Sequence, residues 1–177
     1  MYKNCEWLPE LIKLDTEIDD EIIEILYNIF STDIYGTTLY YKGKEVRFRR
    51  EPMWKGKEEG FFHLISDKNL HGKEYYTLNI DRARRLLWGK AIIEHEPCRL
   101  QSIKKCCKGV YNWSFTYIYN KYNNERVKLL HSEYRYLVIL EERADYWLFI
   151  TGYYIENGYK FKELKKEYID SLKHHKI

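Results

Sequence analysis

The residues of this chain best suited to chemistry are one histidine and an arginine cluster that follows it. His63 interrupts an apolar run, and an unperturbed histidine has a pKa of about 6.5, so it can exchange a proton near neutral pH. Arg82 and Arg85 are three residues apart in a helical pattern, which places both on one helix face. Guanidinium groups bind phosphate oxygens in pairs. The combination indicates metal-independent chemistry on a phosphodiester.

Metal-free RNA cleavage needs a base for the 2′-hydroxyl, cations for the phosphorane and an acid for the leaving 5′-oxygen. We predict that His63 is the base or the acid and that Arg82 and Arg85 bind the phosphate. Thr151 and Tyr153 alternate with a glycine at the end of a predicted strand, so both face one side. Thr151 could position a phosphate, and Tyr153 could stack on a base or donate a proton. The pattern does not identify a second acid/base group.

Each catalytic candidate also has a structural interpretation. A histidine in an apolar run is often a core or edge residue. The two arginines could form a solvated helix face paired with Asp81 or Glu94. Thr151 and Tyr153 are residue types that strands favour in any context. These interpretations remain open at the level of the sequence.

A second stretch could hold a nucleic-acid strand. Arg47 and Arg49 flank Phe48, so cations and aromatics alternate, and such a surface binds phosphates and stacks on bases. A charged edge strand that resists aggregation would show the same pattern. Lys68 and Trp88 complete the predicted substrate-binding set, although a core position suits Trp88 better.

Composition limits the classes of protein that fit. The 177 residues suffice for one domain, and 30 basic against 27 acidic residues give a net charge of +3, so any nucleic-acid affinity must come from a local patch. The four cysteines lack the spacing of a zinc site, and we predict neither a metal nor a cofactor. No apolar run is long enough to span a membrane, so we expect a cytoplasmic protein without a membrane partner.

The expected elements place these residues in an α+β domain. Apolar residues at helical spacing predict two helical pieces in residues 8–30, a central helix at 79–94 and a terminal helix at 160–173. A short strand is expected around Val46 and Phe48, and residues 61–65 fit a strand or the first turn of a helix. Further strands are predicted at 98–103, 111–120, 126–131, 134–141 and 146–155.

The resulting plan is a single domain over residues 1–177, with N-terminal helices, a central helix packed on a curved antiparallel meander, and a C-terminal helix. Residues 1–35 form the N-terminal helical part, 40–156 the core and 157–177 the terminal helix.

Four short motifs in this order resemble the phage- and mobile-element-encoded nuclease domains of the barnase/EndoU/colicin/RelE-like superfamily. They are Phe62-His63-Leu64, the helical residues 82–88, the strand residues 136–140 and Thr151-Gly152-Tyr153-Tyr154. The resemblance covers roughly residues 40–156. It implies N-terminal helices packed on an antiparallel sheet that carries a metal-independent RNase site, and it assigns no role to individual residues.

We therefore expect a small, toxin-like endoribonuclease that acts on RNA, with an antitoxin or a host target as a further partner. A non-catalytic binding module, acting on nucleic acid or as a phage-type inhibitor of a host protein, would use the same basic and aromatic surface. An enzyme acting on a nucleotide or cyclic nucleotide is a third interpretation, because the same histidine and arginines suit a smaller phosphate.

Overall fold

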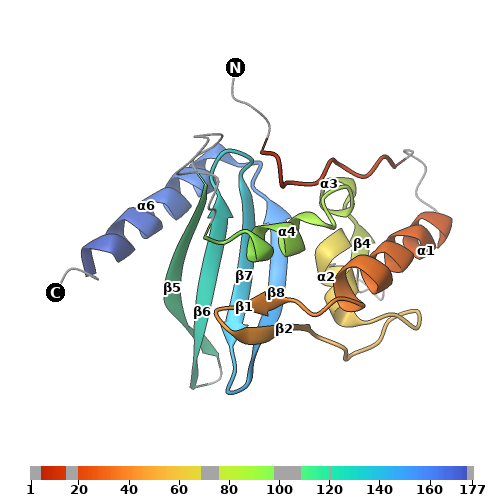
Figure 1. Ribbon diagram of the computed structural model, residues 1–177, viewed down its shortest axis with the longest axis horizontal. Coiled ribbons are helices and arrows are strands. Elements are labelled where there is room, and N and C mark those ends of the chain that lie inside the picture. The colour runs from red at the N-terminus through yellow and green to blue at the C-terminus, as the bar shows by residue number, and fades with distance from the viewer. Residues whose placement is uncertain (1–4, 15–19, 69–75, 98–108, 120, 175–177) are drawn as a thin grey trace.

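A curled six-stranded sheet forms the centre of the molecule, with helices on both of its faces (Figure 1). The computed structural model describes residues 5–14, 20–68, 76–97, 109–119 and 121–174. The strand order is β1-β2-β8-β7-β6-β5. The predicted α+β class, with N-terminal helix, curved and mostly antiparallel sheet and C-terminal helix, is confirmed.

The predicted meander makes up the larger part of the sheet. Its strands are β5 (Val110–Tyr119), β6 (Tyr122–His131), β7 (Tyr136–Glu142) and β8 (Tyr146–Tyr154). Each pairs antiparallel with the next, and the β7–β8 register shifts between Ile139 and Leu140. The expected strand at 98–103 lies outside the described residues.

Two N-terminal strands extend the sheet beyond β8. β2 (Lys44–Phe48) pairs with β8 in parallel, with Val46 opposite Trp147, and β1 (Tyr40–Tyr41) pairs antiparallel with β2. The alternation around Val46 predicted the strand, but nothing in it indicated this parallel partner. β2 reaches β8 only along Tyr146–Phe149, so the remainder of β8 has no neighbouring strand on this side among the described residues.

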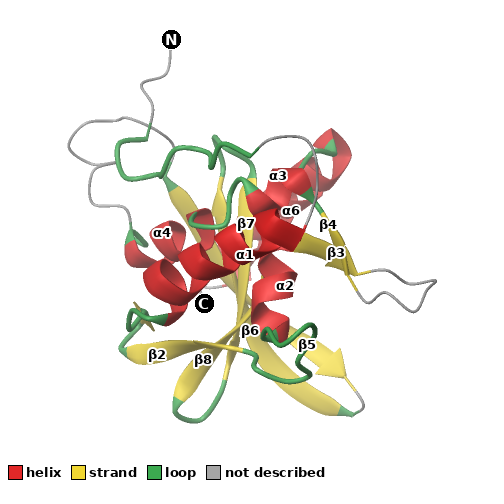
Figure 2. Cartoon of the chain, turned by 90° about the vertical axis from the view of Figure 1, so that its right-hand side faces the viewer, coloured by secondary structure: helices red, strands yellow, loops and turns green. Residues whose placement is uncertain are grey.

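The main core lies between the concave side of the sheet and the N-terminal helices (Figure 2). α1 (Asp20–Ile29) continues into a π-helical turn, η1 (Phe30–Tyr35), and α2 (Glu59–Ile65) follows β2. Helical spacing in α1 puts Ile22 and Leu26 on the buried side. Buried members of this core include Leu26, Phe30, Phe48, Phe61, Phe62, Ile92, Leu140 and Phe149.

The opposite face of the sheet carries α6 (Gly158–His174). Leu164 from this helix packs with sheet residues in a second, smaller core. Its buried sheet members are Trp113, Leu130 and Leu137, with Ile155 beside them. The terminal helix predicted at 160–173 therefore forms and covers part of the second face.

Residues 5–14 differ from the expectation of a helix. They form a strap whose backbone bonds to a distant segment: the Ile12 amide donates to the Arg84 carbonyl at 2.9 Å, and the Pro9 carbonyl accepts from Trp88 Nε1 at 2.9 Å. The Leu14 carbonyl accepts from the Arg84 side chain. This docking, and not helix formation, buries Cys5 and Leu14, whereas Leu11 on the same strap stays exposed.

The central helix predicted at 79–94 is divided into two short helices, α3 (Ile80–Ala83) and α4 (Trp88–Glu94). The strap docks at the break. In a continuous helix the Arg84 carbonyl would accept from the Trp88 amide, but the Ile12 amide takes it, and the Trp88 amide bonds to Arg85 instead. Asn79 caps α3 by accepting from the Arg82 amide.

A two-stranded hairpin beside α2 was not anticipated. β3 (Ser66–Lys68) pairs antiparallel with β4 (Tyr76–Leu78). None of the helices in the described parts of the chain is both long and apolar enough to cross a membrane.

Candidate active site

The helix α2, which carries His63, begins in direct contact with the residue that follows β2. The Gly60 amide donates to the Arg49 carbonyl at 2.8 Å, and a Cβ at Gly60 would lie only 2.9 Å from that oxygen. Glycine is therefore the residue that permits this approach. It fixes the start of α2 beside β2, and the helix also contacts β8.

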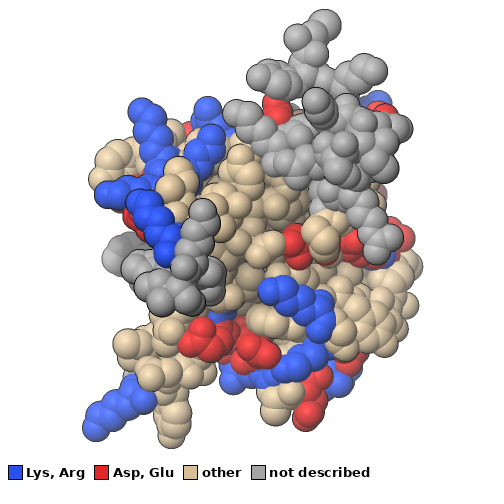
Figure 3. Space-filling model, turned by 60° about the vertical axis from the view of Figure 1, so that its left-hand side comes forward, with Lys and Arg blue, Asp and Glu red and all other residues tan. Residues whose placement is uncertain are grey.

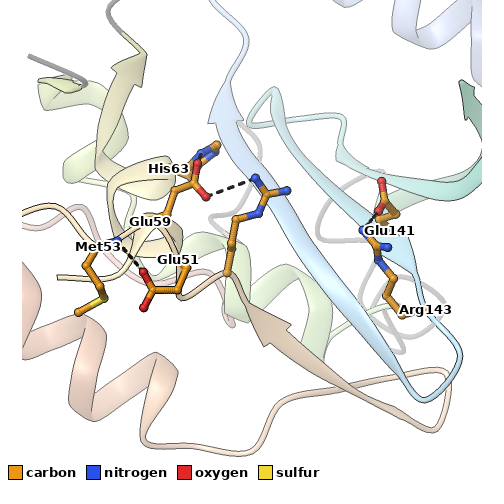
Figure 4. Close-up of polar contacts among 7 residues, drawn as sticks. Glu51, Met53, Glu59, His63, Glu141 and Arg143 are labelled. Carbon is orange, nitrogen blue, oxygen red and sulfur yellow. Dashed lines mark hydrogen bonds and ion pairs between the residues drawn. The ribbon is translucent and has the colours of Figure 1, made fainter. Parts of the chain in front are cut away.

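A carboxylate on α2 links the histidine to an arginine. Glu59 and His63 are four residues apart and lie side by side on the helix (Figure 4), with 3.3 Å between His63 Nε2 and Glu59 Oε1. The second oxygen, Oε2, accepts from Arg49 Nη1 at 3.3 Å. The Glu59 side chain is only 8% exposed, against 30% for His63 and 49% for Arg49. The buried carboxylate of Glu59 thus contacts two side chains, His63 and Arg49, that are more exposed than it is.

A second arginine, Arg82, contacts the backbone of the same histidine. Arg82 Nη1 donates to the His63 carbonyl at 3.1 Å, and Arg82 Nε lies 3.1 Å from Asp67 Oδ1. The guanidinium also lies 5.4 Å from the centre of the Tyr153 ring. His63 is therefore in contact with Arg82 through its backbone and with Glu59 through its side chain.

Arg82 and Tyr153 line one small cavity of about 300 Å³ between α3, β3 and the end of β8. Asp67, Asn79 and Lys160 contribute to the same lining. Burial raises the pKa of Tyr153, and the charges of Lys160 and Arg82 oppose that rise. The Tyr153 phenol consequently keeps its proton at neutral pH and remains a hydrogen-bond donor.

A larger cavity, of about 810 Å³, has Arg49, the partner of Glu59, in its lining. Its cationic lining residues are Arg47, Arg49, Arg50 and Arg143, and we call it the arginine groove. Two of these side chains lie over aromatic rings, Arg47 at 4.7 Å from the Tyr146 ring centre and Arg50 at 5.5 Å from that of Tyr35. Among the described residues of the lining, Glu45 is the one that is acidic. The groove is therefore a net cationic surface with aromatic walls.

A buried carboxylate, Glu141, partly neutralises the positive charge of the groove. Glu141, whose side chain is 2% exposed, pairs with Arg143 (Figure 4) and, at 2.7 Å, with Arg126. One buried carboxylate between two guanidiniums leaves a net positive charge at this point.

The other sequence candidates occupy different surroundings. Arg85 lies over the rings of Trp88 and Tyr154, at 5.2 and 4.5 Å, and pairs with Asp81 at 3.0 Å. Its side chain is only 12% exposed, which indicates a packing role. Trp88 is 6% exposed and bonds to the strap, so it belongs to the core.

Thr151 and Lys68 are not brought into the contacts around His63 by the interactions described. Thr151 is half-buried on β8 opposite Ile139. Lys68 pairs through its backbone with Tyr76 in the β3–β4 hairpin, and its side chain lies outside the described part of the structure.

Glu59 is the site residue that the sequence interpretation missed. The signal was its spacing of four from His63, which is meaningful only if residues 59–65 form a helix. Among the described residues, no group of three or more His, Cys, Asp or Glu side chains is arranged to hold a metal ion.

Comparison with protein-family models, with curated proteins and with solved structures found no match. The function must therefore be argued from the geometry of the site.

Proposed function

We propose that this protein cleaves RNA without a metal ion, at a site centred on His63 and Glu59. The observation that carries the proposal is the position of Glu59, whose carboxylate contacts His63 with one oxygen and Arg49 with the other. Glu59 thus orients His63, and it is a group that the sequence alone did not identify. It also places a phosphate ligand next to the proton carrier.

The chemistry follows from the roles of these groups. Glu59 holds His63 through Nε2, so Nδ1 is the ring atom that takes the proton from the 2′-hydroxyl. The 2′-oxygen then attacks the phosphorus, and the 5′-oxygen leaves, giving a 2′,3′-cyclic phosphate and a 5′-hydroxyl. Arg49 and Arg82 stabilise the charge that develops on the phosphorane.

The proton for the leaving oxygen is assigned to Tyr153. Burial keeps its phenol protonated, and Arg82 lies over its ring. A guanidinium has five N–H donors, so Arg82 can bind a phosphate oxygen while it contacts His63 and Asp67. The neighbouring phosphates of the strand bind in the arginine groove, which begins at Arg49.

Cleavage of labelled RNA by purified protein in EDTA tests the proposal. His63→Ala and Glu59→Gln should each lower the cleavage rate about 10²- to 10⁴-fold, because the first removes the base and the second removes the carboxylate that orients it. The matched control is Glu58→Gln: Glu58 precedes Glu59 and accepts a hydrogen bond from the Tyr27 hydroxyl, which the amide oxygen of glutamine can also accept. Cleavage that survives both site substitutions would overturn the assignment of the site.

A non-catalytic nucleic-acid-binding module is the second candidate, and the arginine groove favours it. Four arginines and two tyrosines in one groove suffice to bind a phosphate backbone without any chemistry. Wild-type protein that binds RNA but leaves it intact in every buffer would select this alternative.

A further inference from the structure

A row of paired residues connects the arginine groove to the far edge of the sheet. The register places Arg47 opposite Leu148, Leu148 opposite Glu141, Glu141 opposite Arg126, and Arg126 opposite Phe115. Directly paired residues project from the same face of a sheet. This row belongs to the face that carries α6, since the adjacent row, which includes Phe48 and Phe149, faces the main core.

α6 covers only part of this face. It packs on Tyr111 and Trp113 at the start of β5, where the Tyr111 and Tyr168 rings stack at 4.6 Å. The alternating positions farther along β5 are Phe115, Tyr117 and Tyr119, and Tyr122 follows opposite Tyr119 on β6. The exposed fractions are 37% for Tyr117, 59% for Tyr119 and 74% for Tyr122. We call Phe115, Tyr117, Tyr119 and Tyr122 the aromatic stripe.

Cationic side chains lie on the aromatic stripe. The Arg126 guanidinium is 3.6 Å from the centre of the Tyr117 ring, and Lys128 Nζ is 4.5 Å from that of Phe115. The strand β5 itself has no charged residue over its ten positions, although 32% of the whole chain is charged. Figure 3 brings this side of the molecule forward and shows basic and acidic side chains interleaved with wide uncharged areas.

We propose that the aromatic stripe binds the unpaired bases of a single-stranded RNA whose phosphates lie in the arginine groove. The inference rests on the proposed function and names its substrate as single-stranded. Every base has a flat face that stacks on tyrosine, whereas the bases of a duplex are already stacked on one another. From β2 to β5 the row crosses four strand spacings of about 4.8 Å, or roughly 19 Å, the length of a few extended nucleotides.

The charge pattern favours RNA over a protein as the occupant of the stripe. Arg126 and Lys128 lie over the rings, and the row leads to Arg47 and Arg143 in the groove. A phosphate backbone that follows the row meets its accessible cations at the groove, because Arg126 and Lys128 at the stripe are paired with Glu141 and Glu167 and are only 16% and 14% exposed. An apolar partner segment would contact the rings but would offer no negative charge to the arginines of the groove to which the row leads.

Binding of a fluorescein-labelled 2′-O-methyl oligouridylate, followed by fluorescence anisotropy at fixed salt, tests the stripe. This probe lacks the 2′-hydroxyl nucleophile, so binding is measured apart from cleavage. Replacing Tyr117, Tyr119 and Tyr122 together by alanine should weaken affinity about 100-fold or more, because each lost base stack costs about 5-fold or more. The triple phenylalanine variant keeps the rings and should bind within a few-fold of wild type.

The control is Tyr159→Ala on α6, whose tyrosine is 72% exposed and should not affect binding. Unchanged affinity in the triple alanine variant, or no binding of the probe by wild type, would overturn the proposal; the first result would leave the stripe as a candidate protein-docking surface. Tyrosine-dependent binding by a wild-type protein that does not cleave unmodified RNA would support the stripe and refute the proposed cleavage.

Discussion

Glu59 is an unusual residue because it is nearly buried and yet shared by two partners. Its carboxylate would be costly to bury alone, and Arg49 and His63 offset that cost. Replacing either partner therefore changes the environment of the other. For this reason a substitution of Arg49 should alter the contact between Glu59 and His63 as well as the binding of phosphate.

His131 provides a prediction about pH and stability. Burial lowers its pKa from 6.5 to about 4, between the rings of Trp7 and Tyr134. The unfolded chain therefore binds the proton more readily than the folded one. The free energy of unfolding should be fully retained above pH 6.5 and should decline as the pH falls to about 4, by about 3 kcal/mol in total.

Urea unfolding at a series of pH values measures this decline. In His131→Gln the free energy of unfolding should be lower at neutral pH. It should also change less between pH 4 and 6.5, because glutamine does not titrate. Equal slopes for wild type and variant in that interval would show that carboxylates alone cause the loss.

The sequence identified three of the residues that the structure connects, namely His63, Arg82 and Tyr153, by their chemical types. It could not supply Glu59. In a strand, two residues four apart lie about 13 Å from each other, whereas in a helix they lie about 6 Å apart. Since the short run at 61–65 fitted either element, the neighbour of His63 was undetermined until α2 was known.

At the level of elements, the contact between α2 and β2 is the most sensitive to substitution. In Gly60→Ala the new Cβ would meet the Arg49 carbonyl at 2.9 Å and Phe48 Cβ at 3.0 Å, and backbone atoms cannot move aside cheaply. We expect a loss of about 1–3 kcal/mol in the free energy of unfolding from overpacking, partly offset by the helix preference of alanine. Cleavage should fall as well, because α2 carries Glu59 away from Arg49.

Thermal unfolding and the RNA assay, run together, check this prediction. The control is Gly158→Ala at the start of α6, where a Cβ meets no atom within 4 Å. A Gly60→Ala variant as stable and as active as Gly158→Ala would show that the approach of α2 to β2 does not position the site.

The broken central helix shows why local pattern alone mispredicted one element. Residues 79–94 carry apolar side chains at helical spacing, and α3 and α4 both form where that pattern lies. At the interruption the Arg84 carbonyl accepts from the Ile12 amide of the strap, and the Trp88 amide bonds to the Arg85 carbonyl. A hydrogen bond between residues so distant in the chain leaves no trace in the sequence of the helix it interrupts.

At the scale of the whole molecule, the strap joins the N-terminus to the segment that bears Arg82. Leu14 is 8% exposed within the main core, whereas Leu11 is 42% exposed on the same strap. Leu14→Ala should cost about 2–5 kcal/mol of unfolding free energy, and Leu11→Ala less than about 1 kcal/mol. Chemical denaturation of the pair measures the difference, and similar costs would mean that the strap does not anchor the fold.

Because β2 pairs with β8, the sheet beside the site cannot form until β8 has been synthesised. A ribosome releases Arg49, Glu59, His63 and Arg82 well before it reaches Tyr146–Phe149, the residues that give β2 its neighbour. A nascent chain therefore has the ionisable groups without the edge that aligns them. A site for RNA cleavage built in this way assembles only after β8 has been synthesised.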